Sequence, residues 1–216
     1  MTIPARREAA RLLISLDPPE WFLRHSCAVA DVAGSLARRA AANGRAVDPV
    51  LVEAAALLHD VDKLPSVEVP GRPRHGDGSA AWLAARGWPE LGPVVRDHPV
   101  TRLAEPDHDA WLAGASLETK IVAYADKRAG QRLEPMRARF ASWRRRYPPG
   151  SGVRVKRTGG TAWDEATMGI VEARAAALER VVCEAAGLRP DGVRRLRWSR
   201  RTIREAARET AREVAR

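Results

Sequence analysis

Apolar residues recur at helical spacing along most of this chain. The clearest pattern runs from about residue 20 to residue 42, where apolar side chains step by three and four: Phe22, Val29, Val32 and Leu36. This spacing places them on one face of a helix, as expected for a helix with one buried side. Pro18 and Pro19 precede the segment and Gly44 follows it, so we predict one helix between them.

Capping residues mark further helices in the first 130 residues. Asp48 followed by Pro49 predicts a helix start, because an aspartate side chain caps free N–H groups and proline fits the first helical position. Ser116 predicts another helix start by the same reasoning. Between them, prolines and glycines from 65 to 78 indicate a loop, followed by an alanine-rich helix and a shorter helix that ends near His98.

The C-terminal third continues the helical pattern after a break. The next apolar stripe consists of Leu133, Met136, Phe140, Trp143 and Tyr147. Pro148-Pro149-Gly150 ends it, and the loop from 151 to 160 is the best candidate boundary, before a long helix over about 163–186. We predict a helical core over residues 1–150 and a C-terminal helical extension over 151–216.

A basic helix is predicted after Ser199, at the end of the extension. Its apolar stripe is thin, with Ile203, Ala207 and Val214. A helix with so little apolar surface can serve as a partner-binding tail, an oligomer contact or a loosely docked terminus.

Composition supports an all-α fold. Aromatic residues make up only 5% of the chain, so its apolar surface must come mainly from Ala, Leu and Val, and alanine and leucine favour helix over strand. No apolar run is long enough to span a bilayer and the N-terminus lacks the apolar core of a signal peptide, so we expect a cytoplasmic protein with no membrane partner. Cys27 and Cys183 lie far apart and are expected to be buried thiols.

The net charge of +10 is concentrated in two segments. Residues 127–157 contain eleven Lys or Arg and one acid, and residues 188–216 contain ten Arg and four acids. Such a field favours anionic ligands, for instance nucleotides, polyphosphates or RNA. A solvated arginine-rich surface explains the C-terminal segment equally well.

Candidate chemistry lies in polar residues at apolar positions. His25 and His59 fall on helix faces that should be buried, where an imidazole needs a hydrogen-bond partner or a metal. Asp60 follows His59 directly, and Asp126 occupies a half-buried position on a later helix. Carboxylates are rarely buried unless they are paired or coordinate a metal, so these four residues indicate a metal site.

These residues and their order resemble the HD superfamily of metal-dependent phosphohydrolases. His25, then His59-Asp60 within LLHDVDKLP, then Asp126 within VAYADKR, follow the order of the family's metal ligands. His75 in RHGDGSA and His98 in VRDHP resemble the extra histidines of branches that hold two metals. The motif context is most similar to the branch of symmetrical diadenosine tetraphosphate hydrolases, although Asp62 stands where the family often has a small residue and Lys127 where that branch commonly has a different residue.

The resemblance implies an HD-domain helical bundle and a two-metal mechanism. By analogy Asp60 bridges the ions, His25, His59 and Asp126 hold one of them, and His75 and His98 hold the other. Metal-bound water then attacks phosphorus, with Asp60 and Lys63 as the expected catalytic residues. Iron or manganese is the expected metal for this ligand set, with magnesium, zinc, nickel and cobalt as alternatives.

Lys63 could also contact the substrate phosphate as a point charge, and Arg128 and Arg132 are candidate phosphate ligands; all three could equally be surface cations. His108 lies between acids in a polar stretch and is expected at the surface. Asp62 could assist the site, but a solvent-facing acid is the simpler expectation. The seven tryptophans are scattered, so we expect them to serve in packing rather than in base stacking.

Three classes of function are compatible with the sequence. The favoured one is a phosphohydrolase that cleaves a phosphoester or phosphoanhydride bond of a nucleotide or dinucleoside polyphosphate. A second is a di-iron HD-type oxygenase, for which the family uses the same ligand pattern. A third is a non-catalytic HD module that binds RNA or a protein partner through its basic C-terminus. The oligomeric state has no signature in the sequence.

Overall fold

The computed structural model describes residues 3–71, 73–154 and 161–214. For residues 213 and 214 it describes the backbone but not the side chains. Within this part of the chain the regular structure is helical, with two isolated β-bridges, Ala129 with Leu133 and Arg154 with Thr161. The α-helices are α1 (Arg6–Ser15), α2 (Glu20–Ala42), α3 (Pro49–Leu58), α4 (Asp77–Ala85), α5 (Leu91–Arg96), α6 (His108–Gly114), α7 (Leu117–Arg128), α8 (Met136–Arg146), α9 (Glu165–Ala185) and α10 (Ser199–Val214). Three short 3₁₀ helices, η1 (Val61–Lys63), η2 (Val100–Ala104) and η3 (Pro190–Gly192), connect them. The predicted all-α fold is confirmed, and no described helix is long and apolar enough to cross a membrane.

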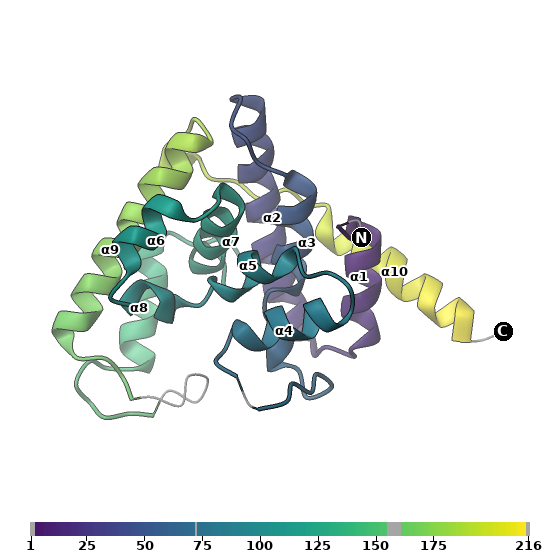
Figure 1. Cartoon of the computed structure of the whole chain (residues 1–216), viewed down its shortest axis with the longest axis horizontal. Coiled ribbons are helices and arrows are strands. Elements are labelled where there is room, and N and C mark those ends of the chain that lie inside the picture. The colour runs from purple at the N-terminus through teal and green to yellow at the C-terminus, as the bar shows by residue number, and fades with distance from the viewer. Residues whose placement is uncertain (1–2, 72, 155–160, 215–216) are drawn as a thin grey trace.

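Helices α2, α3 and α7 form the centre of the molecule (Figure 1). Their buried faces are rich in alanine, which lets the helix backbones approach closely: Ala28, Ala30, Ala33 and Ala37 on α2, and Ala54, Ala55 and Ala56 on α3. Larger side chains such as Leu36, Leu57 and Tyr124 fill the remaining space. The central helices therefore pack tightly around the face that carries the candidate ligands.

The predicted helix boundaries are confirmed where capping residues defined them. The Asp48 carboxylate accepts hydrogen bonds from the backbone N–H groups of Val50 and Leu51, at 2.8 and 3.2 Å. The Ser116 hydroxyl accepts one from the Thr119 N–H at the start of α7. Helix α2 ends just before Gly44, whose φ of 74° is easily reached only without a Cβ.

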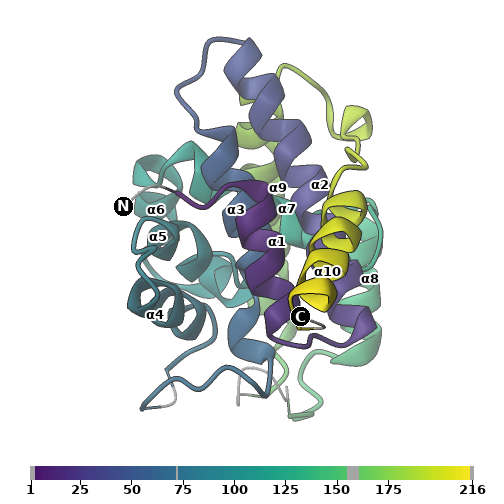
Figure 2. The same cartoon turned by 90° about the vertical axis from the view of Figure 1, so that its right-hand side faces the viewer.

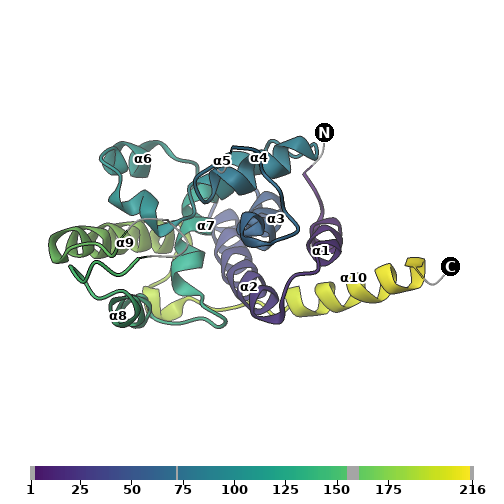
Figure 3. The same ribbon diagram turned by 90° about the horizontal axis from the view of Figure 1, so that it is seen from below.

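Helices α4 and α5 pack against each other, and α5 also contacts α3 and α7 (Figure 3). The segment between η1 and α4 is largely non-helical, as the prolines and glycines predicted. This arrangement places the residues just before α4 and just after α5 beside the C-terminal end of α3.

The C-terminal helices cover the central group from two sides. Helix α9 packs on α7 and η2, with α8 beside it (Figure 1). The predicted apolar stripe of α8 is shorter than expected, because Leu133 lies before the helix and pairs with Ala129. Residues 155–160 of the predicted boundary loop lie outside the described part of the chain.

Helix α10 lies along α1 (Figure 2). Its inner face is formed by Ile203 and Ala206, whereas Ala207 of the predicted stripe is only half-buried and the side chain of Val214 lies outside the described residues. The start of α10 is fixed to α2, because the buried Asp31 carboxylate accepts hydrogen bonds from the Ser199 N–H and from Arg195. The basic C-terminal helix is thus docked along part of its length.

Candidate metal centre

Six predicted ligands from separate elements meet at one end of the central helices: His25 on α2, His59 and Asp60 at the end of α3, His75 before α4, His98 after α5, and Asp126 on α7. Helical spacing predicted that the four residues on helices would lie together. The two loop histidines, His75 and His98, were added through the family resemblance. All six lie together in the structure.

The end of α3 turns two neighbouring side chains into the same space. His59 keeps helical backbone angles, but at Asp60 the chain leaves the helix with φ −106° and ψ 10°. Both side chains are fully buried, and His59 Nε2 lies 3.5 Å from Asp60 Oδ1. An uninterrupted helix would have directed the two side chains about 100° apart.

Asp60 lies between two groups of ligands. On one side, His25 Nε2 is 3.2 Å from His59 Nε2, 3.4 Å from Asp60 Oδ2 and 3.3 Å from Asp126 Oδ1. On the other side, Asp60 Oδ1 lies 3.0 Å from His98 Nε2 and 3.3 Å from His75 Nε2. Each group of three, His25-His59-Asp60 and Asp60-His75-His98, has ligand atoms close enough to share one ion.

Hydrogen bonds orient all four histidine rings in the same sense. In each ring Nδ1 contacts an acceptor and Nε2 faces the centre: His25 with the Gly130 carbonyl at 2.7 Å, His59 with that of Ala56 at 2.8 Å, His98 with that of Val95 at 2.5 Å, and His75 with the Asp62 carboxylate at 3.0 Å. Because carbonyl and carboxylate oxygens only accept, Nδ1 carries the proton, and a neutral ring then presents the Nε2 lone pair to the centre.

This arrangement fits metal ions. The Nε2 atoms of His75 and His98 are 3.1 Å apart, so a proton or a metal ion must lie between or beside their lone pairs. Asp60 Oδ2 is buried and has no hydrogen-bond partner among the described residues, which is costly unless a cation is bound. Nitrogen and oxygen donors without thiolate suit divalent transition ions.

The electrostatics of the centre show how strongly its carboxylates attract positive charge, whether a proton on a histidine or a metal ion. Burial lowers the pKa of His25, but the carboxylates of Asp126 and Asp60 outweigh it and raise that pKa to about 9. Burial lowers the pKa of His98 to about 4. Although burial opposes it, neighbouring cationic groups hold the pKa of Asp60 and that of Asp126 well below the ordinary value. Two buried carboxylates therefore stay ionised and need positive charge beside them.

Lys63 supplies part of that positive charge. Its Nζ lies 2.5 Å from Asp60 Oδ1, and the side chain is 15% exposed, so the ammonium group sits at the edge of the centre rather than in open solvent. The short η1 helix brings Lys63 back beside Asp60 within one turn. Lys63 therefore lies beside the candidate ligands, where the sequence pattern had suggested it.

Asp62 does not face solvent, contrary to the simpler expectation. Its carboxylate accepts from His75 Nδ1 and, at 2.8 Å, from the Gly76 N–H. Two glycines leave room for this contact. A Cβ on Gly78 would lie 2.9 Å from the Asp62 side chain, and one on Gly76 would lie 2.4 Å from the Arg96 carbonyl oxygen. Asp62 thus orients a predicted metal ligand, as carboxylates commonly do beside metal-binding histidines.

The two candidate phosphate-binding arginines lie in different settings. Arg128 is buried, and its guanidinium donates to Glu179 at 3.0 Å, to the Tyr124 hydroxyl and to the carbonyls of Glu134 and Pro190. This arrangement gives no support to a phosphate-binding role, because the donors already hold α7 against α9. Arg132 is 81% exposed and pairs with Glu134.

His108 is buried, so its expected surface position was wrong. It begins α6 with its ring tilted against that of Trp111, and neither ring nitrogen has a hydrogen-bond partner among the described residues. Burial and the charge of Arg174 lower its pKa. The acids beside it in the sequence misled the prediction, because Asp107 and Asp109 face outward while the histidine faces inward.

Sequence reasoning also missed Lys127 and Trp21. Lys127 is buried beside Asp126, and its Nζ donates to the His98 carbonyl at 2.7 Å and to that of Ala123 at 3.0 Å. It therefore helps to fix the segment that carries His98. Trp21 precedes His25 by one helical turn, a spacing that could have associated it with the site.

Converging imidazole and carboxylate groups within an all-α bundle are typical of a helical metal-binding protein, and the two groups of ligand atoms could each hold an ion. A family model described as HD domain matches residues 22–130, which is half of the chain and contains all six candidate ligands. The chain therefore belongs to the HD domain family, a family of metal-dependent phosphohydrolases. Searches of curated proteins and of solved structures returned no significant match.

Proposed function

We propose that this chain binds two divalent metal ions and hydrolyses a phosphoester or phosphoanhydride bond of a nucleotide or dinucleoside polyphosphate. The observation that carries the proposal is the position of Asp60 between two groups of Nε2 atoms. His25, His59 and Asp126 would hold one ion, His75 and His98 the other, and Asp60 both. Iron or manganese is our first expectation for this set of donors.

Metal ions bound at such a site lower the pKa of a coordinated water and neutralise charge that develops on a phosphoryl group. The residues of the chain supply the remaining requirements. Once a metal ion displaces the Nε2 protons, the histidines would direct their Nε2 lone pairs at the centre, because their Nδ1 protons are bound by carbonyl groups and Asp62. The Lys63 ammonium lies at the edge of the centre, where it can bind a phosphate oxygen.

The proposal is tested by metal analysis of the purified protein beside a phosphate-release screen over nucleotides and dinucleoside polyphosphates. We expect about two metal ions per chain in the wild type. Asp60→Ala should lose both metal and turnover, because this carboxylate contacts both groups of histidines. Asp109→Ala, which removes an exposed acid on α6, is the control and should keep both.

His75→Ala gives a second test that disturbs the core less, since His75 is 15% exposed. It should retain one ion and lose most of the turnover. A wild-type protein that binds no metal and releases no phosphate would refute the proposal. Metal-dependent consumption of oxygen without phosphate release would identify the oxygenase instead.

A further inference from the structure

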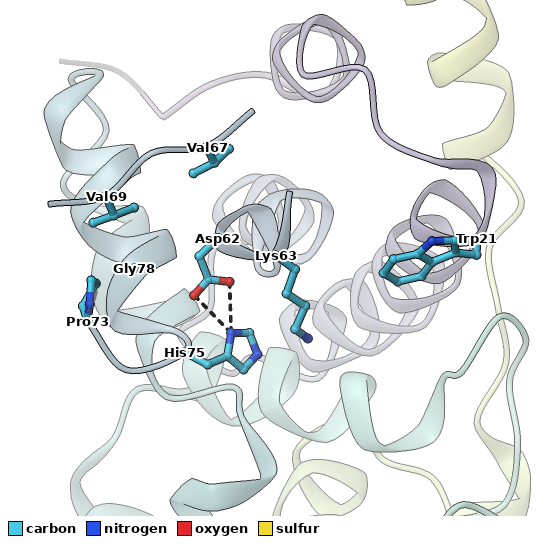
Figure 4. Close-up of a pocket in the computed structure, with 8 residues that line it drawn as sticks. All are labelled: Trp21, Asp62, Lys63, Val67, Val69, Pro73, His75 and Gly78. Atoms are coloured by element: carbon cyan, nitrogen blue, oxygen red, sulfur yellow. Dashed lines mark hydrogen bonds and ion pairs between the residues drawn. The ribbon is translucent and has the colours of Figure 1, made fainter. Parts of the chain in front are cut away.

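A cavity of about 460 Å³ opens beside the candidate metal centre (Figure 4). Lys63, His75 and Asp62 line it, and the first two of these also contact Asp60. A phosphate group held at the centre would therefore leave the rest of its molecule in this cavity. Its volume is within the range of roughly 300–1,000 Å³ that is usual for small-molecule sites.

The walls of the cavity are apolar, in contrast to the three polar residues. Figure 4 shows Trp21 on one side of Lys63 and His75, and Val69 with Pro73 on the other. The cavity thus joins a charged region to apolar surfaces within one space. This combination fits a ligand with an anionic group joined to a flat apolar group better than it fits inorganic phosphate or a lipid chain.

Trp21 is much more exposed than the buried tryptophans of the core. Its side chain is 38% exposed, whereas Trp82, Trp111 and Trp198 are at most 8% exposed. The neighbouring Phe22 is fully buried and packs edge-on against the indole, with ring centroids 5.7 Å apart. The ring is therefore anchored on one side while part of its surface faces the cavity.

The position of Trp21 on α2 sets its distance from the candidate ligand His25. It lies four residues before His25, so the Cα atoms of the two residues are about one turn, or roughly 6 Å, apart along the helix axis. That separation matches the length of a sugar between a base and a phosphate. An aromatic group could stack on the indole while its phosphate reaches the ligands.

We propose that this cavity binds the nucleoside part of the substrate and that the base stacks on Trp21. The inference rests on the proposed phosphohydrolase function and assigns the base of its substrate to Trp21. Stacking on an indole is tolerant of base identity, because every base has an aromatic face. The enzyme should therefore bind compounds with a base more tightly than base-free compounds, without discriminating strongly among bases.

The test compares phosphorylated compounds with and without a base. The probes are AMP, ATP and diadenosine tetraphosphate on one side, and ribose 5-phosphate and inorganic tripolyphosphate on the other. In the metal-loaded protein, Trp21→Ala should raise KM for the adenine compounds about tenfold, as expected for the loss of one stacked base. The increase for the base-free compounds should be smaller, and Trp21→Phe should restore most of the affinity.

Ile170→Ala is the matched control, because it removes an apolar side chain that is 50% exposed on α9 and does not line the cavity. Its KM values should equal those of the wild type. Thermal unfolding of each variant checks that the fold is intact. Val69→Ala tests the opposite wall, and a larger effect there than at Trp21 would overturn the assignment of the base to the indole.

Calorimetric titration with AMP separates this inference from the proposed function. Binding that weakens in Trp21→Ala, with no hydrolysis of any probe, would support the nucleoside site and refute the hydrolase. Hydrolysis whose KM is the same in the wild type and Trp21→Ala would support the hydrolase and overturn the nucleoside site. Absence of both AMP binding and hydrolysis would overturn both.

Discussion

Three of the four histidines that face the centre are held by backbone carbonyl groups, and only His75 is held by a side chain. A carbonyl cannot be removed by substitution, but Asp62 can. Its carboxylate also accepts from the Gly76 N–H, so it fixes both the ring and the backbone that carries it. The second group of ligands therefore depends on this one residue more than on any other outside the ligand set.

We predict that Asp62→Ala weakens the ion at His75 and His98 and spares the ion at His25 and His59. Loss of such an orienting carboxylate commonly reduces metal affinity by about 10- to 100-fold. Metal titration should then show one site of unchanged affinity and one weakened site. Asp77→Ala, a nearby acid paired with Arg96, serves as the control. Equal weakening of both sites would contradict this role.

A second residue-scale prediction concerns pH and the buried His108. Because its pKa is lowered in the folded protein, protonation below the ordinary value of 6.5 favours the unfolded chain. His108→Gln removes this effect. Relative to wild type, the variant should therefore gain free energy of unfolding as the pH falls from 7.5 to 5.5, as measured by urea denaturation. A difference that is independent of pH would show that His108 is not the group responsible.

Single site residues could be identified from the sequence where helical spacing alone determines their environment. His25, His59 and Asp126 were identifiable because helical spacing alone places a polar residue on a buried face. Asp62 and His108 were not, since their environments are made by distant parts of the chain: the loop before α4 for Asp62, and the packing of α9 near η2 for His108. Local polarity suggested solvent in both cases.

At the scale of elements, the loop before α4 depends on a glycine. Gly76 has φ of 91°, and a Cβ there would lie 2.4 Å from the Arg96 carbonyl oxygen. Gly71 also has a positive φ, of 79°, but a Cβ there would meet nothing within 4 Å. An alanine at Gly71 would therefore be unfavourable through its backbone conformation alone, whereas an alanine at Gly76 would also clash with its surroundings.

We expect Gly71→Ala to cost about 1 kcal/mol, from backbone conformation alone. Gly76→Ala should cost clearly more and should also weaken metal binding, because the loop must move and carries His75 with it. Urea denaturation and metal titration of the two variants provide the comparison. Similar losses in both would mean that the loop relaxes around the added methyl group.

Helices α7 and α9 are joined by a buried ion pair between Arg128 and Glu179. Removing one partner leaves a buried charge, so Glu179→Ala should destabilise the protein by about 3 kcal/mol. Glu172→Ala, on the same helix, removes a pair with Arg144 in which both side chains are about one-third exposed, and should cost less than about 1 kcal/mol. Chemical denaturation measures both values, and equal costs would argue against a structural role for Arg128.

Elements were predictable where the signal was local. The caps at Asp48 and Ser116 located α3 and α7 because a cap and its N–H partners are close in sequence. The extent of α8 was not predictable, since Leu133 is apolar at the expected spacing yet lies in a bridge to Ala129. Apolar periodicity does not distinguish a residue in the helix from one that packs just before it.

At the scale of the whole molecule, the candidate centre concentrates two ionised carboxylates in the interior. A chelator should therefore lower the midpoint of thermal unfolding of the wild type. Ligand at one hundred times its dissociation constant adds roughly 2.7 kcal/mol to the free energy of unfolding, and removing it reverses this gain. Differential scanning calorimetry of Asp60→Ala, which should respond little to the chelator, is the control. An identical shift in both proteins would locate the effect elsewhere.

The candidate ligands are widely spaced along the chain: His25 contacts Gly130, 105 residues later, and Asp60 contacts His98, 38 residues later. The contacts of this centre join distant segments of the chain, so we expect it to close after α2, α3 and α7 have packed. Interactions that form this late act mainly on the rate of unfolding. If ions bind as proposed, the native-state lifetime, and with it resistance to proteolysis, would follow the metal supply of the cell.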